Sequence, residues 1–313
     1  MSINNKSNLN LTKGYDPNTA KTLAACLDLV YGQYANNKEN PLVELPGYKQ
    51  TAALYAAEIP VMKNEVIEQL GDLEKIDLTD LPGLKKMIKS LKLGQKEVYF
   101  GSVLESTYEP RHFIVALRGT MTLYEMKEDV VFLQKAVSPA WFTPGDVKNV
   151  RAHIGFLIIY ALLVDQIKHA LTELNAEAGF ITGHSLGGAL AILAAATIGT
   201  IIHPDKGIDG SIQMYNFGGP RLGNKSFKDA YDPQLPYSYR VTNLADACPI
   251  VPPEEIPDKI PLEYDYTHVG KEFSYLWQTY DIFANHDLTG NYLPAVNQEV
   301  PTDKPRTYPC PGI

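Results

Sequence analysis

The sequence predicts an α/β fold with a mainly parallel central sheet and helices on both of its faces. From residue 153 onward, apolar segments with the length of buried strands alternate with segments of helical periodicity. Such alternation is typical of parallel strands joined by crossover helices. The chain has 313 residues, of which 45% are hydrophobic, and this is enough to bury a sizeable core. We expect one domain over residues 1–313, with the polar residues 1–13 as a flexible tail.

The first half of the chain is predicted to hold two helices and a hairpin. Residues 16–35 carry apolar side chains at helical spacing after Asp16-Pro17, a cap followed by proline in the first turn. Residues 77–93 follow the same pattern. Residues 97–106 and 112–117 indicate two strands, because a Glu-Pro turn signal separates two apolar runs.

The second half supplies the alternation of helices and strands. The expected elements are a helix over 156–174, a strand over 180–182, a helix over 187–198, and strands over 212–217 and 237–242. Ligand sites of open α/β sheets form at the carboxyl ends of the parallel strands. Functional side chains are therefore expected just after these strands.

Composition excludes several classes of protein. The formal net charge of -8 would repel phosphates, so nucleic acid is not an expected partner. No apolar run approaches the roughly 18 residues of a membrane span, the nearest being 154–164, and we expect no transmembrane segment. Residues 1–13 lack the regions of a signal peptide, which predicts a cytoplasmic location for the chain as written and secretion if a signal was removed.

The cysteines indicate neither a metal site nor a disulfide framework. Cys26, Cys248 and Cys310 lie far apart and show no metal-ligand spacing. This leaves room for one bridge at most.

Ser185 is the candidate nucleophile. It lies in a Gly-x-Ser-x-Gly pattern. A short buried strand is predicted over residues 179–182, just before the pattern, and a helix over residues 188–196, just after it. The two glycines allow strand and helix to approach at a sharp, strained turn. The turn puts Ser185 at a helix N-terminus, where the N–H of Leu186 would stabilise negative charge on a substrate oxygen. The pattern predicts a serine hydrolase of the α/β-hydrolase type.

Such a serine needs a histidine as base and a carboxylate that orients the histidine, and in this fold they follow the serine in the order acid, then histidine. Asp246 is the leading acid because it directly follows a predicted strand. Its rivals Asp258 and Asp265 lie in Pro-rich and aromatic stretches, where exposed loop carboxylates are common.

The same order leaves His203, His268 and His286 as possible bases. His203 is expected in a surface loop, with no acid close behind it. Order alone does not separate the other two. His286 lies in a polar, Gly-containing stretch that indicates a loop, whereas His268 lies at a predicted strand. Since a loop can swing toward the sheet edge, the pattern favours His286.

Taken together and in order, seven segments resemble the class 3 lipase family of fungal triacylglycerol lipases, feruloyl esterases and plant relatives. The resemblance covers roughly residues 95–295. The segments are Val115–Thr120, Ala152–Phe156, Gly183–Gly188, Asn216–Asn224, Arg240–Pro249, Thr267–Gly270 and His286–Leu288.

The resemblance implies roles for individual residues. Ser185 is the nucleophile, Asp246 the acid and His286 the base, with His268 outside the triad. It also implies that Thr120 and Leu186 donate hydrogen bonds to the oxyanion. No metal or organic cofactor is implied.

Residues 121–150 lie where lipases of this family carry a lid over the site. Residues 121–132 have apolar and charged side chains on opposite helical faces, so they are equally consistent with a fixed amphipathic crossover helix. Met126 stands where a lid tryptophan is common in the family.

The function implied is that of a lipase cleaving acylglycerol esters through an acyl-enzyme on Ser185, with a lipid substrate met at an oil–water interface. One alternative is a carboxylesterase or feruloyl esterase acting on dissolved esters. Another is an inactive lipid-binding module, against which the intact Ser, Asp and His set argues. The sequence does not indicate an oligomeric state.

Overall fold

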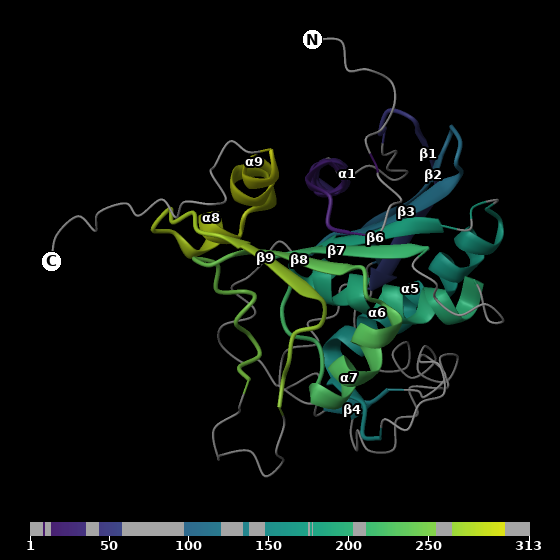
Figure 1. Ribbon diagram of the computed structural model, residues 1–313. Coiled ribbons are helices and arrows are strands. Elements are labelled where there is room, and N and C mark those ends of the chain that lie inside the picture. The colour runs from purple at the N-terminus through teal and green to yellow at the C-terminus, as the bar shows by residue number, and fades with distance from the viewer. Residues whose placement is uncertain are drawn as a thin grey trace, which may run out of the picture.

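The computed structural model is built on a seven-stranded sheet with helices on both faces (Figure 1). The structure describes residues 9, 14–35, 44–57, 97–119, 134–137, 148–174, 176, 178–202, 211–254 and 265–297. The strands of the sheet are β1 (Tyr48–Ala57), β2 (Glu97–Ser106), β3 (His112–Leu117), β6 (Ala178–His184), β7 (Ile212–Phe217), β8 (Ser238–Asn243) and β9 (Lys271–Tyr275). They lie in the order β1-β2-β3-β6-β7-β8-β9.

The sheet is antiparallel at one end and parallel over the rest. β1 pairs with β2 and β2 with β3 in antiparallel fashion, whereas every later neighbour pair is parallel. The predicted hairpin and the predicted parallel sheet are therefore confirmed. The register sets Leu117 beside Gly183 and His184 beside Phe217. The carboxyl ends of β3, β6 and β7 thus meet at one edge.

Helices cover both faces of this sheet. In Figure 1, α1 (Pro17–Ala35) and α9 (Leu293–Val296) lie on one face, and α5 (Ile154–Thr172), α6 (Leu186–Ile202) and α7 (Lys225–Gln234) lie on the other. The helix α8 (Ile282–His286) and the π-helix η3 (Leu288–Tyr292) lead into α9. A separate two-stranded sheet joins β4 (Gln134–Ala136) to β5 (Arg151–His153).

Side-chain caps fix where α1 and α5 begin. The Asp16 carboxylate accepts the backbone N–H of Thr19 at 3.0 Å, so the predicted cap of α1 is confirmed. The Nδ1 atom of His153 accepts the N–H of Gly155 at 3.0 Å. Because His153 caps α5, this helix starts at Ile154, two residues before the predicted start.

Helix α5 contains the apolar run 154–164 and extends beyond it. It has 19 residues and, within the described part of the chain, it is long and apolar enough to cross a membrane by length and composition alone. In the structure, 72% of its apolar window is buried, and the helix packs against α6 and β1. Burial of this kind is what a core helix shows.

Other expectations differ in detail. His268 was expected at a strand, but β9 begins only at Lys271, and an isolated bridge joins Thr267 to Gly223. His286 was expected in a loop and instead ends the helix α8. The predicted helix over 77–93 lies outside the described residues. Most of the candidate lid 121–150 does too, although β4 within it is paired with β5.

The packing of α1 generates a stability prediction. Leu27 of α1 is fully buried against the sheet, within the same apolar cluster as Phe180 and Tyr215. We expect Leu27→Ala to lower the free energy of unfolding by about 2 to 5 kcal/mol, because it deletes buried methyl groups and leaves a cavity. The exposed control Lys21→Ala should change it by less than about 0.5 kcal/mol. Equal effects of the two substitutions in urea denaturation would show that α1 is not docked as described.

Candidate active site

Ser185 lies in a tight turn between β6 and α6, and this turn can form only where the neighbouring residues are very small. Its φ angle is +59°, which is uncommon for a residue with a side chain and costs about 1–3 kcal/mol. A Cβ atom at Gly183 would lie 1.9 Å from the Gly187 carbonyl oxygen, and one at Gly187 would lie 2.1 Å from the carbonyl oxygen of Leu117. Glycine is therefore required at both positions for the turn to close.

Asp246 and His286 form a buried hydrogen-bonded pair beside this turn. The Nδ1 atom of His286 donates to Oδ2 of Asp246 at 2.7 Å, across 40 residues of sequence. Asp246 follows β8 by three residues, and His286 ends α8. The ring of His286 lies 4.6 Å from that of His184, the residue that precedes Ser185. The fold thus gathers the three predicted residues at the carboxyl edge of the sheet.

Two further groups hold the Asp246 carboxylate. The Tyr292 hydroxyl donates to Oδ2 at 2.6 Å, and the Cys248 backbone N–H donates to Oδ1 at 2.8 Å. Burial and the Asp246 charge raise the pKa of Tyr292 well above its usual value, so the phenol remains a donor. A carboxylate that accepts three hydrogen bonds is fixed in orientation.

The environment makes His286 a stronger base than a free histidine. Burial alone would lower the pKa of its imidazole, but the Cys248 sulfur and the Asp246 carboxylate beside the ring raise it, and the net shift is upward. The Nε2 atom of His286 is buried and has no hydrogen-bond partner among the described residues. A buried nitrogen without a partner is available to form a hydrogen bond with a substrate or with a serine hydroxyl.

A second, uncharged chain of hydrogen bonds joins α1 to the same edge. The Gly119 N–H donates to the Tyr31 hydroxyl at 2.8 Å, this hydroxyl bonds Nδ1 of His184 at 2.9 Å, and Nε2 of His184 bonds the His286 carbonyl at 2.8 Å. Since the carbonyl can only accept, Nε2 of His184 donates and its Nδ1 accepts. Burial and the neighbouring His286 lower the pKa of His184 well below the usual value, which keeps the ring neutral.

The hydrogen bonds of the Tyr31 hydroxyl hold the segment that precedes Thr120 next to Ser185. A Cβ atom at Gly119 would lie 2.5 Å from the Ser185 Cβ. Thr120 itself lies outside the described residues. Leu186 is the first residue of α6, so its N–H has no acceptor within the helix.

The remaining candidates from the sequence lie elsewhere. His268 donates from Nε2 to the carbonyl of Pro249 at 2.7 Å, and burial together with nearby arginines lowers its pKa to about 3. It is a neutral hydrogen-bonding residue. Asp265 is exposed and accepts the N–H of Lys225 at the start of α7. His203, Asp258 and Cys310 lie outside the described residues, and Cys26 and Cys248 are buried free thiols.

Sequence reasoning missed Tyr31, Tyr292 and the bridging role of His184. Tyr31 and Tyr292 lie on elements far from Ser185 in sequence and reach the site only through tertiary packing. One indirect signal exists for Tyr292. A Cβ atom at Gly218 would lie 2.7 Å from the Tyr292 hydroxyl oxygen and 2.9 Å from Oδ2 of Asp246, so this glycine marks a close approach.

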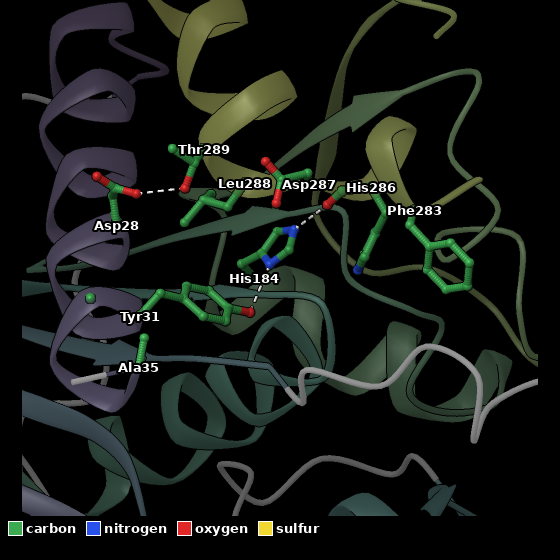
Figure 2. A pocket seen from close by; sticks show the side chains of 10 residues that line it. Asp28, Tyr31, Ala35, His184, Phe283, His286, Asp287, Leu288 and Thr289 are labelled. Atoms are coloured by element: carbon green, nitrogen blue, oxygen red, sulfur yellow. Dashed lines mark hydrogen bonds between the residues drawn. The ribbon is translucent and has the colours of Figure 1, made fainter. Parts of the chain in front are cut away.

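A cavity of about 450 Å³ opens beside the paired residues (Figure 2). It lies between α1 and the segment from α8 to η3, and Figure 2 shows His184 between these two walls. The lining residues are Asp28, Tyr31, Gly32, Ala35, His184, Phe283, His286, Asp287, Leu288 and Thr289. A bound molecule in this cavity would contact the ring of His286.

Part of the chain is similar in sequence to known lipases. Residues 114–256 match the family model of class 3 lipases. A secreted mono- and diacylglycerol lipase of Fusarium solani is 30% identical over 55% of this chain and 46% of its own length. A chloroplastic phospholipase A1 of Arabidopsis thaliana is 28% identical over 57% of this chain and 41% of its own length. The chain thus spans less than half the length of these curated relatives.

Solved structures support the fold. The Lip2 lipase of Yarrowia lipolytica has a TM-score of 0.56 at 14% identity, over 83% of this chain and 79% of that one. Lipase II of Rhizopus niveus has a TM-score of 0.50 at 21% identity, over 75% of this chain and 73% of that one. At these identities the likeness concerns the α/β-hydrolase fold, and the predicted fold class is confirmed.

The pairing of His286 with Asp246 generates a titration prediction. We expect Asp246→Asn to lower the pKa of the His286 imidazole by about 1 to 3 pH units, because the carboxylate stabilises the protonated ring. Proton NMR titration of the ring resonances measures this directly. Asp265→Asn, which changes the rival acid, should leave the pKa of His286 unchanged. An equal response to both substitutions, or none to Asp246→Asn, would contradict the pairing.

Proposed function

Because residues 114–256 place this chain in the class 3 lipase family, we propose that it hydrolyses acylglycerol esters through an acyl-enzyme on Ser185. The observation that carries the proposal is the buried pair of His286 and Asp246 beside the strained turn of Ser185. A hydroxyl becomes an effective nucleophile only next to such a base. The relatives named above act on acylglycerols and phospholipids by their names, and this class of substrate is proposed here for the chain.

In the first step, the Ser185 oxygen attacks the ester carbonyl carbon while Nε2 of His286 takes the serine proton. Asp246 holds the ring through Nδ1 and stabilises the imidazolium that forms. The carbonyl oxygen becomes negatively charged, and the N–H groups of Thr120 and Leu186 are the proposed donors to it. The start of α6 adds the favourable end of its dipole.

The tetrahedral intermediate then collapses. The bond from carbon to the leaving alcohol breaks, His286 returns its proton to the alcohol oxygen, and the acyl group stays on Ser185. Water then attacks the acyl carbon while His286 takes a water proton, the bond from the acyl carbon to the Ser185 oxygen breaks, and His286 returns the proton to that oxygen as the fatty acid leaves. These steps use the residues of the chain for binding, proton transfer and charge stabilisation.

Exposed apolar side chains near the pair favour a lipid over a dissolved ester as substrate. Leu244 and Ile250 flank Asp246 in sequence and are 61% and 62% exposed. Ile282 and Phe283 precede His286 in α8, and each is 43% exposed. Exposed apolar groups gathered around a site are typical of surfaces that contact lipid. Residues 121–150 remain the proposed lid region.

The nucleophile is tested by Ser185→Ala. We expect turnover of p-nitrophenyl butyrate to fall at least about 1000-fold, because the acyl-enzyme cannot form. The matched control is Ser274→Ala, at an exposed serine of the edge strand β9, which should retain full turnover. Undiminished turnover by Ser185→Ala would overturn the proposal. A turnover that rises above the solubility limit of the ester would favour a lipase over a soluble esterase.

A further inference from the structure

We propose that Asp28 and Asp287 make the cavity beside His286 selective for uncharged, hydroxyl-bearing leaving groups over leaving groups that carry a phosphate. The inference rests on the proposed function and names the class of alcohol that the site releases. It predicts cleavage of partial acylglycerols in preference to anionic phospholipids.

The mechanism determines which part of the substrate enters this cavity. His286 must return its proton to the leaving oxygen, so the leaving alcohol has to lie against the His286 ring. The cavity is lined by that ring and by His184, next to Ser185. His286 is only 4% exposed, and its Nε2 has no partner among the described residues. The cavity is therefore the space in which the rest of the leaving alcohol would lie.

Apart from the imidazoles of His184 and His286, the groups in the described lining that can be charged near neutral pH are the carboxylates of Asp28 and Asp287. Asp28 lies in α1, and Asp287 lies between α8 and η3 (Figure 2). Within the described lining there is no lysine or arginine. The nearby Arg118 is only 1% exposed, lies over the Tyr34 ring and donates to the carbonyls of Tyr99 and Gly119, so its guanidinium is not presented to a molecule in the cavity.

Each carboxylate also retains acceptor capacity for a hydroxyl. One oxygen of Asp28 accepts the Thr289 hydroxyl at 2.6 Å, and Oδ1 of Asp287 accepts the Gly290 N–H. Each carboxylate has about four lone-pair sites, so acceptor sites remain for the hydroxyls of a glycerol unit. A phosphate would place acceptor oxygens and negative charge against the two carboxylates. Neither its oxygens nor its charge can interact favourably with them.

The expected discrimination is moderate. One unit charge at about 4 Å from another in water changes an equilibrium about fivefold, and more where water is partly excluded. Two carboxylates in one cavity should therefore disfavour an anionic leaving group by roughly tenfold or more.

The test compares kcat/KM for two dissolved short-chain substrates, dihexanoylglycerol and dihexanoylphosphatidylglycerol, each as monomers. The double variant Asp28→Asn with Asp287→Asn removes both charges and keeps the oxygens that accept from Thr289 and Gly290. We expect the phospholipid-to-diacylglycerol ratio of kcat/KM to rise about tenfold, while kcat/KM for the diacylglycerol changes less than about threefold. Asp229→Asn, at an exposed carboxylate on α7, is the matched control and should leave the ratio unchanged.

A second measurement needs no variant. Raising NaCl from about 0.01 M to about 1 M shortens the Debye length from about 30 Å to about 3 Å, so the ratio should rise in the unaltered protein. A ratio that responds to neither change, or an unaltered protein that prefers the anionic substrate, would overturn the inference. Absence of hydrolysis of both substrates would instead overturn the proposed function, and the inference with it.

Discussion

Close approach of three chain segments at Ser185 is the constraint on which the rest of the site depends. The end of β3, the end of β6 and the start of α6 converge so tightly that Gly119, Gly183 and Gly187 have no space for a Cβ atom. Ser185 itself takes a left-handed backbone conformation, which costs about 1–3 kcal/mol. Burial of β6 and α6 in the core offsets this cost, since the residues from Ala189 to Ala196 are almost completely buried. Ser185 is thereby held in place by a well-packed part of the core.

Two neighbouring imidazoles at this edge behave in opposite ways, and the difference follows from their partners. His184 is held between a phenol and a carbonyl, so burial keeps it neutral and it acts as a connector between α1, the serine turn and the His286 backbone. His286 is held by a carboxylate, so its protonated form is stabilised. The two rings lie only 4.6 Å apart, and protonation of one disfavours protonation of the other. A proton taken from serine would therefore reside on His286, beside Asp246, and not on His184.

Much of the fold and the pair of acid and base could be predicted from sequence, for identifiable reasons. The hairpin, the alternation after residue 153 and the turn of Ser185 depend on local periodicity and on glycine spacing, which a sequence displays directly. Strand β9 has four exposed residues out of five, so it lacks an apolar signal. Helix α7 is polar and contains Pro233 one residue before its end, so it lacks a helical signal too. Tyr31 and Tyr292 reach the site through packing across 153 and 46 residues of sequence, which no local pattern encodes. In the structure it is His286, and not His268, that pairs with Asp246, and His286 ends a helix where a loop was predicted.

We propose that Ser185, and no other nucleophile in this site, carries the acyl group. Cys248 makes the question specific, because its buried sulfur lies beside the ring of His286. The most direct measurement is mass spectrometry of peptides after acid quenching during turnover of a slowly hydrolysed p-nitrophenyl ester. If Ser185 carries the acyl group, we expect an acyl adduct on the peptide that contains Ser185, formed at the rate of the initial burst of p-nitrophenol. An adduct on the peptide that contains Cys248, or a burst without an adduct on Ser185, would contradict it.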